Sequence, residues 1–324
     1  MNKVWNAARF VLSNLQDFKV PAEGLKALPN KTNISVFDQW IISKLSDVEK
    51  SVQESLESEK FSDAAITLYQ FIWNQFCDWY IEFSKPFLAT QAAGAAQISP
   101  EDREASQLVM AHVLNRIVRL LHPFCPFITE EIYAKLPLKN DACIIDQYPT
   151  VLNDKDFLNL GSKTAEFEID VVKEVITAIR NIRGENRISP AVKLNVRLGV
   201  TDAKTQKILS ANRTAIMTMG RLENLDIGED GNLMKCAVAP VTVQEAHVKV
   251  IIPLEGLVDF NEELKRIQKL IEKLDKDINL LTNKLSNEKF VQNADEDVIA
   301  ADRLLLQQSK VQIVSLKDAL TRFQ

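Results

Sequence analysis

The N-terminal half of the chain repeats apolar side chains at helical spacing, with polar residues on the opposite face of each segment. The sequence Ser99-Pro100-Glu101-Asp102 is typical of a helix start, with serine as N-cap, proline in the first turn and acids beside it. Together these amphipathic stripes predict a helical bundle over residues 1–150. The predicted helices cover residues 1–16, 36–58, 62–85, 100–121 and 127–136.

The pattern changes after residue 150. Short alternating or continuous apolar runs indicate strands, and two stretches between them keep helical spacing. We therefore expect a small mixed α/β connector domain over residues 151–256. Its predicted helices cover residues 168–183 and 203–219, and its predicted strands cover 192–200, 222–227, 237–243 and 248–254.

The last part of the chain has the most regular pattern. From Phe260 to Leu285, apolar residues alternate in steps of four and three, which predicts a helix roughly 40 Å long with one apolar seam. A break at 287–293 separates it from a second helix, whose seam is interrupted by Asp302 and Ser309. An antiparallel coiled-coil hairpin over residues 257–324 is the interpretation that accounts for both seams.

The net charge is −5, which argues against indiscriminate binding to nucleic acid, but the charges are unevenly distributed. Residues 171–221 contain ten basic and three acidic residues, a local balance of 10 − 3 = +7. Such an excess suits a polyanion held at one face, although solvated helix faces produce the same pattern. No apolar run approaches the roughly 18 residues of a membrane span, and the N-terminus is a poor secretion signal. We expect a cytosolic protein.

Catalytic and metal-binding motifs are missing from the sequence. It contains neither of the common glycine-rich phosphate loops, no G-x-S-x-G turn and no H-E-x-x-H pair. The four cysteines form no closely spaced pair, so we predict no metal site and buried reduced thiols. His122, before Pro123, is expected to be a structural, hydrogen-bonded side chain. The adjacent acids at 130–131 and 262–263 suit helix starts better than acid–base catalysis.

Three segments carry a family resemblance. They are NKVWNAARF at 2–10, WNQFCDWYIEFSKP at 73–86 and HPFCPFITEEIY at 122–133. In this order they closely resemble the anticodon-binding bundle of class I aminoacyl-tRNA synthetases for branched aliphatic amino acids. The runs IIPLEGLVDFNEELKRIQKLIEKLDKDI at 251–278 and KLSNEKFVQNA at 284–294 are similar to the C-terminal arm of the valyl-tRNA synthetase branch of that family.

The resemblance implies a function for a longer protein. Members of this family activate valine with ATP and Mg²⁺, attach it to tRNA(Val) and edit misacylated threonine. Their catalytic and editing domains, with the HIGH and KMSKS motifs, precede the helical bundle, and neither motif occurs here. We therefore expect a C-terminal part that binds tRNA(Val), carries no cofactor, is inactive alone and is a monomer without DNA or membrane partners. A helical bundle pattern is also already under way at the first residues, as in a piece of a longer protein.

The resemblance also implies particular RNA contacts. Lys3, Arg9 and Phe10 match the lysine, arginine and aromatic residue that the family places against anticodon bases, where rings stack on unpaired bases. From spacing alone, Phe10 would belong to the helical core, and it is the resemblance that favours base stacking; Trp5 is expected in the core. Weaker matches to the tRNA backbone lie in the connector and arm: Arg180, Arg183, Arg187, Lys265, Lys269, Lys273 and Lys276.

Two alternatives stay open from the sequence. The connector arginines could lock the connector to the bundle through carboxylates instead of contacting phosphates. The whole chain could also be a bundle and coiled coil that binds another protein and no RNA.

Overall fold

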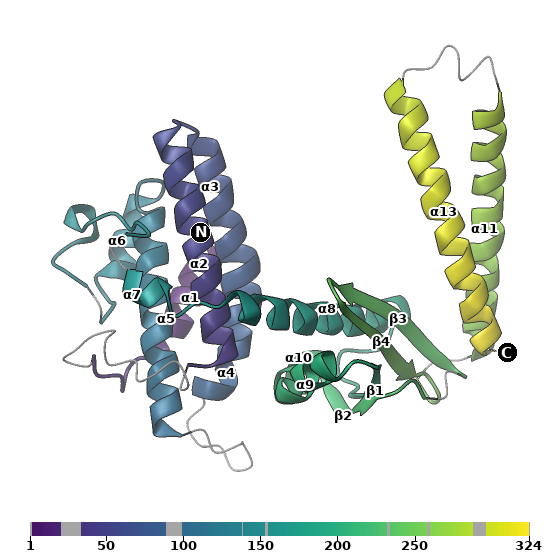
Figure 1. The fold of residues 1–324 in the computed structure, drawn as a ribbon, viewed down its shortest axis with the longest axis horizontal. Coiled ribbons are helices and arrows are strands. Elements are labelled where there is room, and N and C mark those ends of the chain that lie inside the picture. Colours follow the sequence, from purple (N-terminus) through teal and green to yellow (C-terminus); the bar gives the residue numbers. More distant parts are fainter. Residues whose placement is uncertain are drawn as a thin grey trace. The chain divides into compact units, whose positions relative to one another are not determined.

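The structure is a computed structural model that describes residues 2–20, 34–88, 99–137, 139–152, 155–231, 234–257, 260–287 and 296–323 (Figure 1). The chain divides into two compact units, Met1–Asp170 and Val171–Gln324, and each is considered by itself. Among the described residues, none of the helices has the length and apolar character that crossing a membrane requires.

The first unit is the predicted helical bundle. Its starts follow local chemistry: the Ser99 hydroxyl accepts from the Asp102 amide at 3.0 Å, and Ser35 accepts from Asp38 at 3.1 Å. The described elements are α1 (Asn2–Ser13), α2 (Val36–Glu57), α3 (Phe61–Gln70), η2 (Phe71–Tyr80), α4 (Ile81–Leu88), α5 (Pro100–Leu121), α6 (Pro126–Tyr133), η3 (Cys143–Ile145), α7 (Lys155–Leu158) and the start of α8 (Lys163–Glu185).

The third predicted helix differs from expectation at both ends. It begins at Phe61, one residue before the predicted start, and α4 ends at Leu88, three residues after the predicted end. It then continues without a break through η2, a π-helix of ten residues, into α4, with Pro86 inside the helix. A π-helix has more residues per turn than an α-helix, so the faces before and after it are not in one line. The sequence predicted one simple stripe here and was wrong about that.

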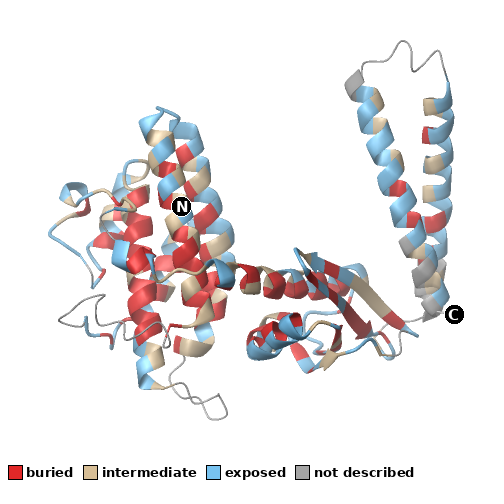
Figure 2. Cartoon of the chain, viewed as in Figure 1, coloured by how far each residue is buried: buried red, intermediate tan, exposed pale blue. Residues whose placement is uncertain are grey.

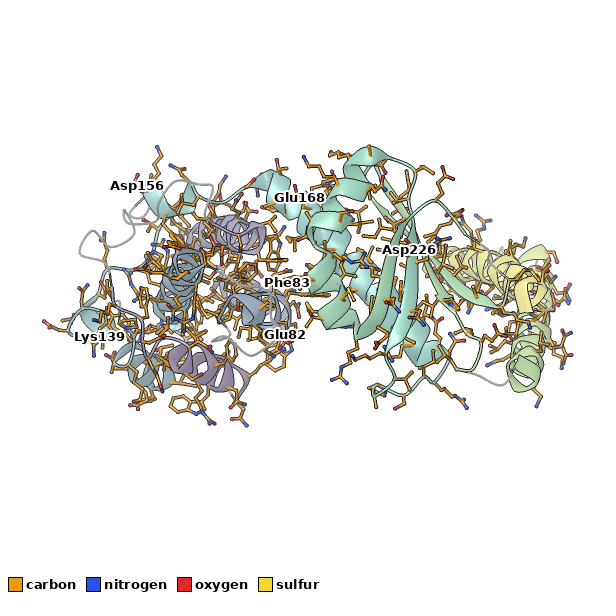
Figure 3. The ribbon with its side chains drawn as sticks, turned by 90° about the horizontal axis from the view of Figure 1, so that it is seen from below. Glu82, Phe83, Lys139, Asp156, Glu168 and Asp226 are labelled. Atoms are coloured by element: carbon orange, nitrogen blue, oxygen red, sulfur yellow. The ribbon has the colours of Figure 1, made fainter. Side chains whose placement is uncertain are left out.

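Aromatic side chains and one buried acid form the centre of the bundle. Trp40 and Tyr80 are fully buried, and Phe37 stacks on Phe83 with ring centroids 4.5 Å apart. In Figure 3 the side chains of the bundle fill the space between its helices. Asp38 accepts hydrogen bonds from the Tyr80 hydroxyl at 2.7 Å and from the Ser106 hydroxyl at 3.0 Å. Burial raises the pKa of Asp38 despite these bonds.

A second buried polar group joins α2 to α5. The side chains of Glu49 and Arg116 are 0% and 2% exposed, and Arg116 Nη2 lies 2.5 Å from Glu49 Oε2. The same nitrogen donates to the carbonyl oxygen of Thr150 at 3.0 Å. Both charges are therefore compensated inside the bundle, and the segment after α6 is tied to α5 through the arginine.

The second unit contains a four-stranded mixed sheet in the order β2-β1-β4-β3. Strands β1 (Leu194–Gly199) and β2 (Leu222–Gly228) are parallel, whereas β3 (Cys236–Val243) and β4 (Ala246–Pro253) pair antiparallel. All four predicted strands are confirmed. The single helix predicted between the parallel strands is two helices, α9 (Ala203–Ala211) and α10 (Arg213–Gly220). Asn212 ends one and starts the other, with its side chain bonded to the Ile208 carbonyl.

Strand β3 lies at one end of the sheet, and Pro240 lies inside it, opposite Lys249 of β4. Proline has no backbone N–H and is tolerated in a sheet only where no partner strand needs that donor, as on an edge strand.

The predicted helical hairpin is also confirmed. It consists of α11 (Phe260–Ser286) and α13 (Glu296–Phe323), while most of the predicted break between them lies outside the described residues. The two polar residues that interrupt the second seam, Asp302 and Ser309, are both accommodated inside the hairpin. Asp302 forms an ion pair with Lys284 at 2.7 Å, and Ser309 is buried. A small residue and a paired acid thus occupy positions where apolar residues are usual.

Candidate nucleic-acid interface

The exposed side of α1 contains an open hollow of about 570 Å³. Ala7, Ala8 and Val11 on the other side of the helix are buried in the bundle, which fixes how α1 faces solvent. Arg9 is exposed and Phe10 is half-buried, and both line the hollow. Four further α1 residues and neighbours complete the lining: Asn6, Leu12, Ser13 and Gln16.

This hollow combines an aromatic ring, a cation and polar groups. Phe10 is not part of the buried core, so its ring is partly available to a ligand, and the Lys85 ammonium lies 5.9 Å from the ring centroid. Such a set can stack on a flat heterocycle and neutralise a phosphate beside it. The structure thus brings Arg9 and Phe10 together, two of the three residues that the sequence grouped.

The third residue, Lys3, faces η2 instead. Its ammonium donates to Asp78 Oδ1 at 2.5 Å and to the Trp73 carbonyl at 3.4 Å. It also lies 4.0 Å above the centroid of the Trp73 ring. Lys3 does not line the hollow of Arg9 and Phe10. In this arrangement Lys3 anchors the start of α1 to η2.

The sequence expected Trp5 in the core, and this was wrong, because its side chain is 36% exposed. Ile66, Tyr69 and Trp73 lie at helical spacing and are exposed as well, with the Tyr69 and Trp73 rings stacked 5.3 Å apart. The bundle buries a different face of the same helices, which includes Leu68. The sequence did contain an indication of this exposed stripe, because apolar residues lie on two sides of the helix and a bundle buries only one of them.

The connector arginines have different environments. Arg183 is buried, and its guanidinium donates to the carbonyl oxygens of Ser189, Val192, Gly220 and Arg221 at 2.7 to 3.4 Å. Burial, followed by the nearby Arg221, lowers its pKa. The sequence left open phosphate contacts or a lock to the bundle through carboxylates, whereas the described contacts of Arg183 are with carbonyl oxygens of the connector itself. A phosphate contact would require Arg183 to leave these acceptors.

Arg180 and Arg187 are exposed. Arg180 donates to the carbonyl oxygen of Met219 at 3.3 Å. Arg187 has a φ of 54°, in the left-handed region, at the turn that follows α8. Because both are exposed, each presents a positive charge at the surface of the connector, within the stretch 171–221 that has an excess of basic residues.

The arm lysines lie along α11. Lys269, Lys273 and Lys276 are exposed and are spaced by four and three residues, so they share one side of the helix. The side chain of Lys265 lies outside the described residues. The partner helix α13 exposes apolar side chains that the sequence did not single out, among them Val311 and Val314. These two line a hollow of about 460 Å³ together with Arg303, Leu306, Gln307 and Lys310.

One group of side chains could hold a metal ion. The ligand atoms of His122, Glu130 and Cys143 lie within 4.8 Å of one another. Burial, followed by the negative charge of Glu130, raises the pKa of the Cys143 thiol to about 11. This is the only such group of three among the residues that the structure describes.

Two family models match the chain. Residues 38–198 match the anticodon-binding domain of tRNA ligase, and residues 259–324 match the valyl tRNA synthetase tRNA binding arm. The first range begins after α1, so the match does not test Lys3, Arg9 and Phe10. The two matches do agree with the bundle and the hairpin of the structure.

Curated relatives match almost the whole chain. A valine–tRNA ligase of Bdellovibrio bacteriovorus is 72% identical over all 324 residues, which are 36% of its own length. Valine–tRNA ligases of Geobacter sulfurreducens and Thermotoga maritima are 37% and 34% identical over 99% and 98% of the chain, and the chain covers 34% and 33% of them. The chain thus spans about a third of the length of these relatives. It belongs to the valyl-tRNA synthetase family and corresponds to the C-terminal third of its members.

Proposed function

We propose that this chain is the tRNA-binding C-terminal part of a valine–tRNA ligase and binds tRNA(Val) at two points. The observation that supports this most is the open hollow on α1, where Arg9 and Phe10 stand side by side on a helix fixed by the bundle. The division into bundle, connector and arm at residues 1–150, 151–256 and 257–324 remains part of the proposal.

At the first point, the α1 hollow receives anticodon bases. The bases of an anticodon loop are unstacked, so an exposed aromatic ring can stack on one of them and an arginine can contact a base edge or a phosphate. Phe10 supplies the ring and Arg9 the cation. Lys3 acts from its place over Trp73, where its bond to Asp78 holds the first turn of α1 in position.

At the second point, the connector and the arm hold the body of the tRNA. Arg180, Arg187, Lys269, Lys273 and Lys276 are exposed and suit backbone phosphates, while Lys265 belongs to the same proposed row. Arg183 contributes indirectly. Its hydrogen bonds keep the loop at Ser189–Val192 against the end of α10, and Arg187 lies in the turn that leads into this loop.

The parent enzyme attaches valine to tRNA(Val) with ATP and Mg²⁺. The 324 residues contain neither the HIGH nor the KMSKS motif nor a glycine-rich phosphate loop, so no residue set here fits the nucleotide. We place ATP, Mg²⁺ and the editing of threonine in the part of the relatives that this chain does not span. The chain itself is inactive alone, acts in the cytoplasm as a monomer, and has no DNA or membrane partner.

A titration tests the proposal. The 324-residue chain is mixed with a tRNA(Val) transcript and with the same transcript carrying a foreign anticodon, at several salt concentrations. We expect salt-dependent binding to both, and tighter binding to the cognate anticodon. An affinity that does not change with salt concentration, or the absence of binding, contradicts the RNA function. Equal binding to both transcripts removes the anticodon role and leaves the contacts to the tRNA body.

A matched pair of variants tests the α1 hollow. Phe10→Ala should weaken cognate binding by about 1–3 kcal/mol, because one base loses its stacking partner. Phe61→Ala removes an exposed phenylalanine, 59% accessible, at the start of α3 and serves as the control. If both variants bind alike, or if Phe10→Ala loses thermal stability with unchanged binding, Phe10 belongs to the core and not to the RNA interface.

A further inference from the structure

Three elements of the bundle bring a histidine, a glutamate and a cysteine together. His122 is the C-cap of α5, Glu130 lies in α6 and Cys143 opens the short turn η3. The sequence separations are 8 and 13 residues, far from the short spacings of common zinc motifs, which is why the sequence predicted no metal site. Their ligand atoms nevertheless lie within 4.8 Å of one another.

The hydrogen bonds of His122 fix which nitrogen is free for a metal. Its Nδ1 lies 2.8 Å from the Thr129 hydroxyl oxygen. The same hydroxyl lies within donating distance of the carbonyl oxygens of Cys125 at 2.8 Å and Pro126 at 3.0 Å. When its single proton points to these carbonyls, Nδ1 is the donor to the hydroxyl, and the lone pair of the neutral imidazole lies on Nε2. This is the outer-shell arrangement that orients a metal-binding histidine.

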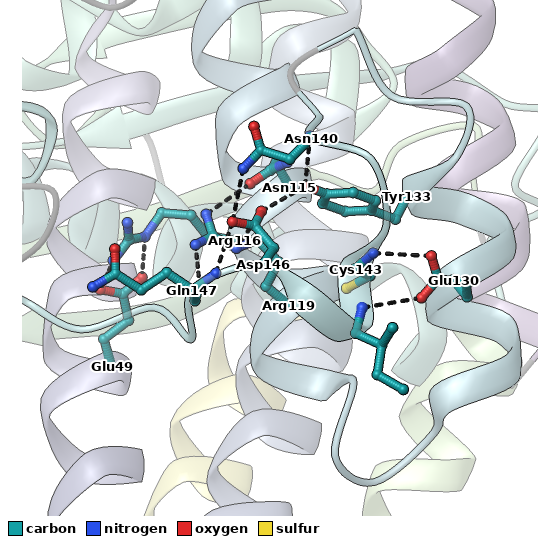
Figure 4. Close-up of polar contacts among 11 residues, drawn as sticks. Glu49, Asn115, Arg116, Arg119, Glu130, Tyr133, Asn140, Cys143, Asp146 and Gln147 are labelled. Atoms are coloured by element: carbon teal, nitrogen blue, oxygen red, sulfur yellow. Dashed lines mark hydrogen bonds and ion pairs between the residues drawn. The ribbon is translucent and has the colours of Figure 1, made fainter.

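Glu130 and Cys143 are held in place independently of any ion. The backbone amides of Cys143 and Ile144 donate to Glu130 Oε1 at 2.9 Å and to Oε2 at 3.2 Å, as Figure 4 shows. Each carboxylate oxygen keeps a second lone pair after accepting one hydrogen bond. The same two bonds attach η3 to α6, so the Cys143 side chain starts from a fixed backbone next to the carboxylate.

We propose that the His122 imidazole, a Glu130 carboxylate oxygen and the Cys143 thiolate bind one zinc ion. Nitrogen, oxygen and sulfur ligands of this kind are those that zinc takes in proteins, and three of them leave a fourth position for water. Ligand atoms around tetrahedral zinc are about 3.5 Å apart, so the three side chains need to close by roughly 1 Å. His122 and Glu130 are half-buried, so closing the site means adjusting their side-chain torsions.

Binding exchanges a proton for the metal. The thiol of Cys143 gives up its proton to solvent, the sulfur lone pair forms the bond to zinc, and no oxidant or reductant is involved. The site would then pin η3, and with it the segment after α6, to the ends of α5 and α6. It has no part in catalysis and does not depend on the proposed RNA function.

Co²⁺ is the probe for this site, because it binds to zinc sites and, unlike Zn²⁺, gives absorption bands that report its ligands. The 324-residue chain is stripped with a chelator and titrated with CoCl₂ and then with ZnCl₂. We expect one Co²⁺ per chain with a sulfur-to-cobalt charge-transfer band in the near ultraviolet, release of one proton, and replacement by Zn²⁺. A chain that shows no charge-transfer band, or only fractional weak binding, overturns the proposal.

Variants identify the ligands. Cys143→Ser should abolish the charge-transfer band, whereas Cys236→Ser, which changes a buried cysteine of the other unit, should leave it intact. Thr129→Val keeps every ligand but removes the acceptor for His122 Nδ1, and it should weaken zinc binding by about 10–100-fold. A band that survives in Cys143→Ser, or that is lost equally in Cys236→Ser, contradicts the assignment. If Cys143→Ser does not fold by circular dichroism, Thr129→Val and His122→Gln decide the question by the same titration.

Discussion

The bundle and the helical hairpin are both made of long helices, yet they bury very different amounts of side chain. The bundle encloses whole aromatic rings such as Trp40 and Tyr80, and Figure 2 shows broad buried faces on its helices. In the hairpin, the buried aliphatic side chains among the described residues are Ile267, Ile271, Leu281 and Ile313. The bundle therefore holds its surface groups on a rigid core, whereas the hairpin depends on one narrow seam.

If the bundle has the more extensive core, removing a charge from that core should have the largest effect on stability. Glu49→Ala leaves Arg116 buried without its carboxylate, and we expect a loss of about 3–5 kcal/mol in the free energy of unfolding, measured by urea denaturation. Glu82→Ala is the control, because it removes an exposed partner of Lys85 and should change stability by at most about 1 kcal/mol. Similar effects of the two variants would show that the Glu49–Arg116 pair is not buried as described.

The seam of the hairpin should be the next most sensitive place. Ile267→Ala removes a side chain that is 1% exposed, and we expect a loss of about 2 kcal/mol, at the low end for a buried isoleucine because only two helices surround it. Hydrogen exchange should show faster amide exchange in α11 and α13 with little change in the bundle. Leu280→Ala, at a position 66% exposed on α11, is the control. Faster exchange throughout the bundle would show that the two regions are not independent.

Acid should weaken the bundle through Glu166. Burial alone would raise the pKa of Glu166, but hydrogen bonds from Lys163, Lys44 and Ser43 hold it below its ordinary value of 4.5. A carboxyl whose pKa is lowered on folding adds stability above the unfolded value and loses it as pH falls. At pH 7 Glu166→Gln should therefore cost about 1 kcal/mol, and the difference from the unchanged chain should shrink as the pH falls below 4.5.

Glu168→Gln, at the position labelled in Figure 3, changes a neighbouring acid of α8 for which the described residues show no ion pair, and it is the control for this pH series. A pH-independent difference between Glu166→Gln and the unchanged chain would show that Glu166 is not ionised within the fold.

The sequence predicted the elements well, because helix periodicity, the Ser99 cap and strand patterns are local properties. It did not predict which of two apolar faces would be buried, so it placed Trp5 wrongly in the core. Burial is decided by neighbours that are distant in sequence. Likewise Arg183 finds carbonyls 37 and 38 residues away, which no local pattern indicates.

The candidate RNA residues show the same limit. Arg9 and Phe10 are adjacent in sequence and share a hollow, whereas Lys3, one helical turn or more away, faces another helix. The zinc ligands come from three elements, so only the fold brings them together.

Pro240 has a consequence for how copies of this protein behave at high concentration. It lies in β3, at the end of the sheet, where an unpaired strand edge offers backbone groups to any extended chain, including another copy. A strand added along this edge finds no N–H at Pro240, so the ladder of hydrogen bonds is interrupted in its middle. The proline thus works against edge-to-edge aggregation while it leaves the pairing of β3 with β4 intact.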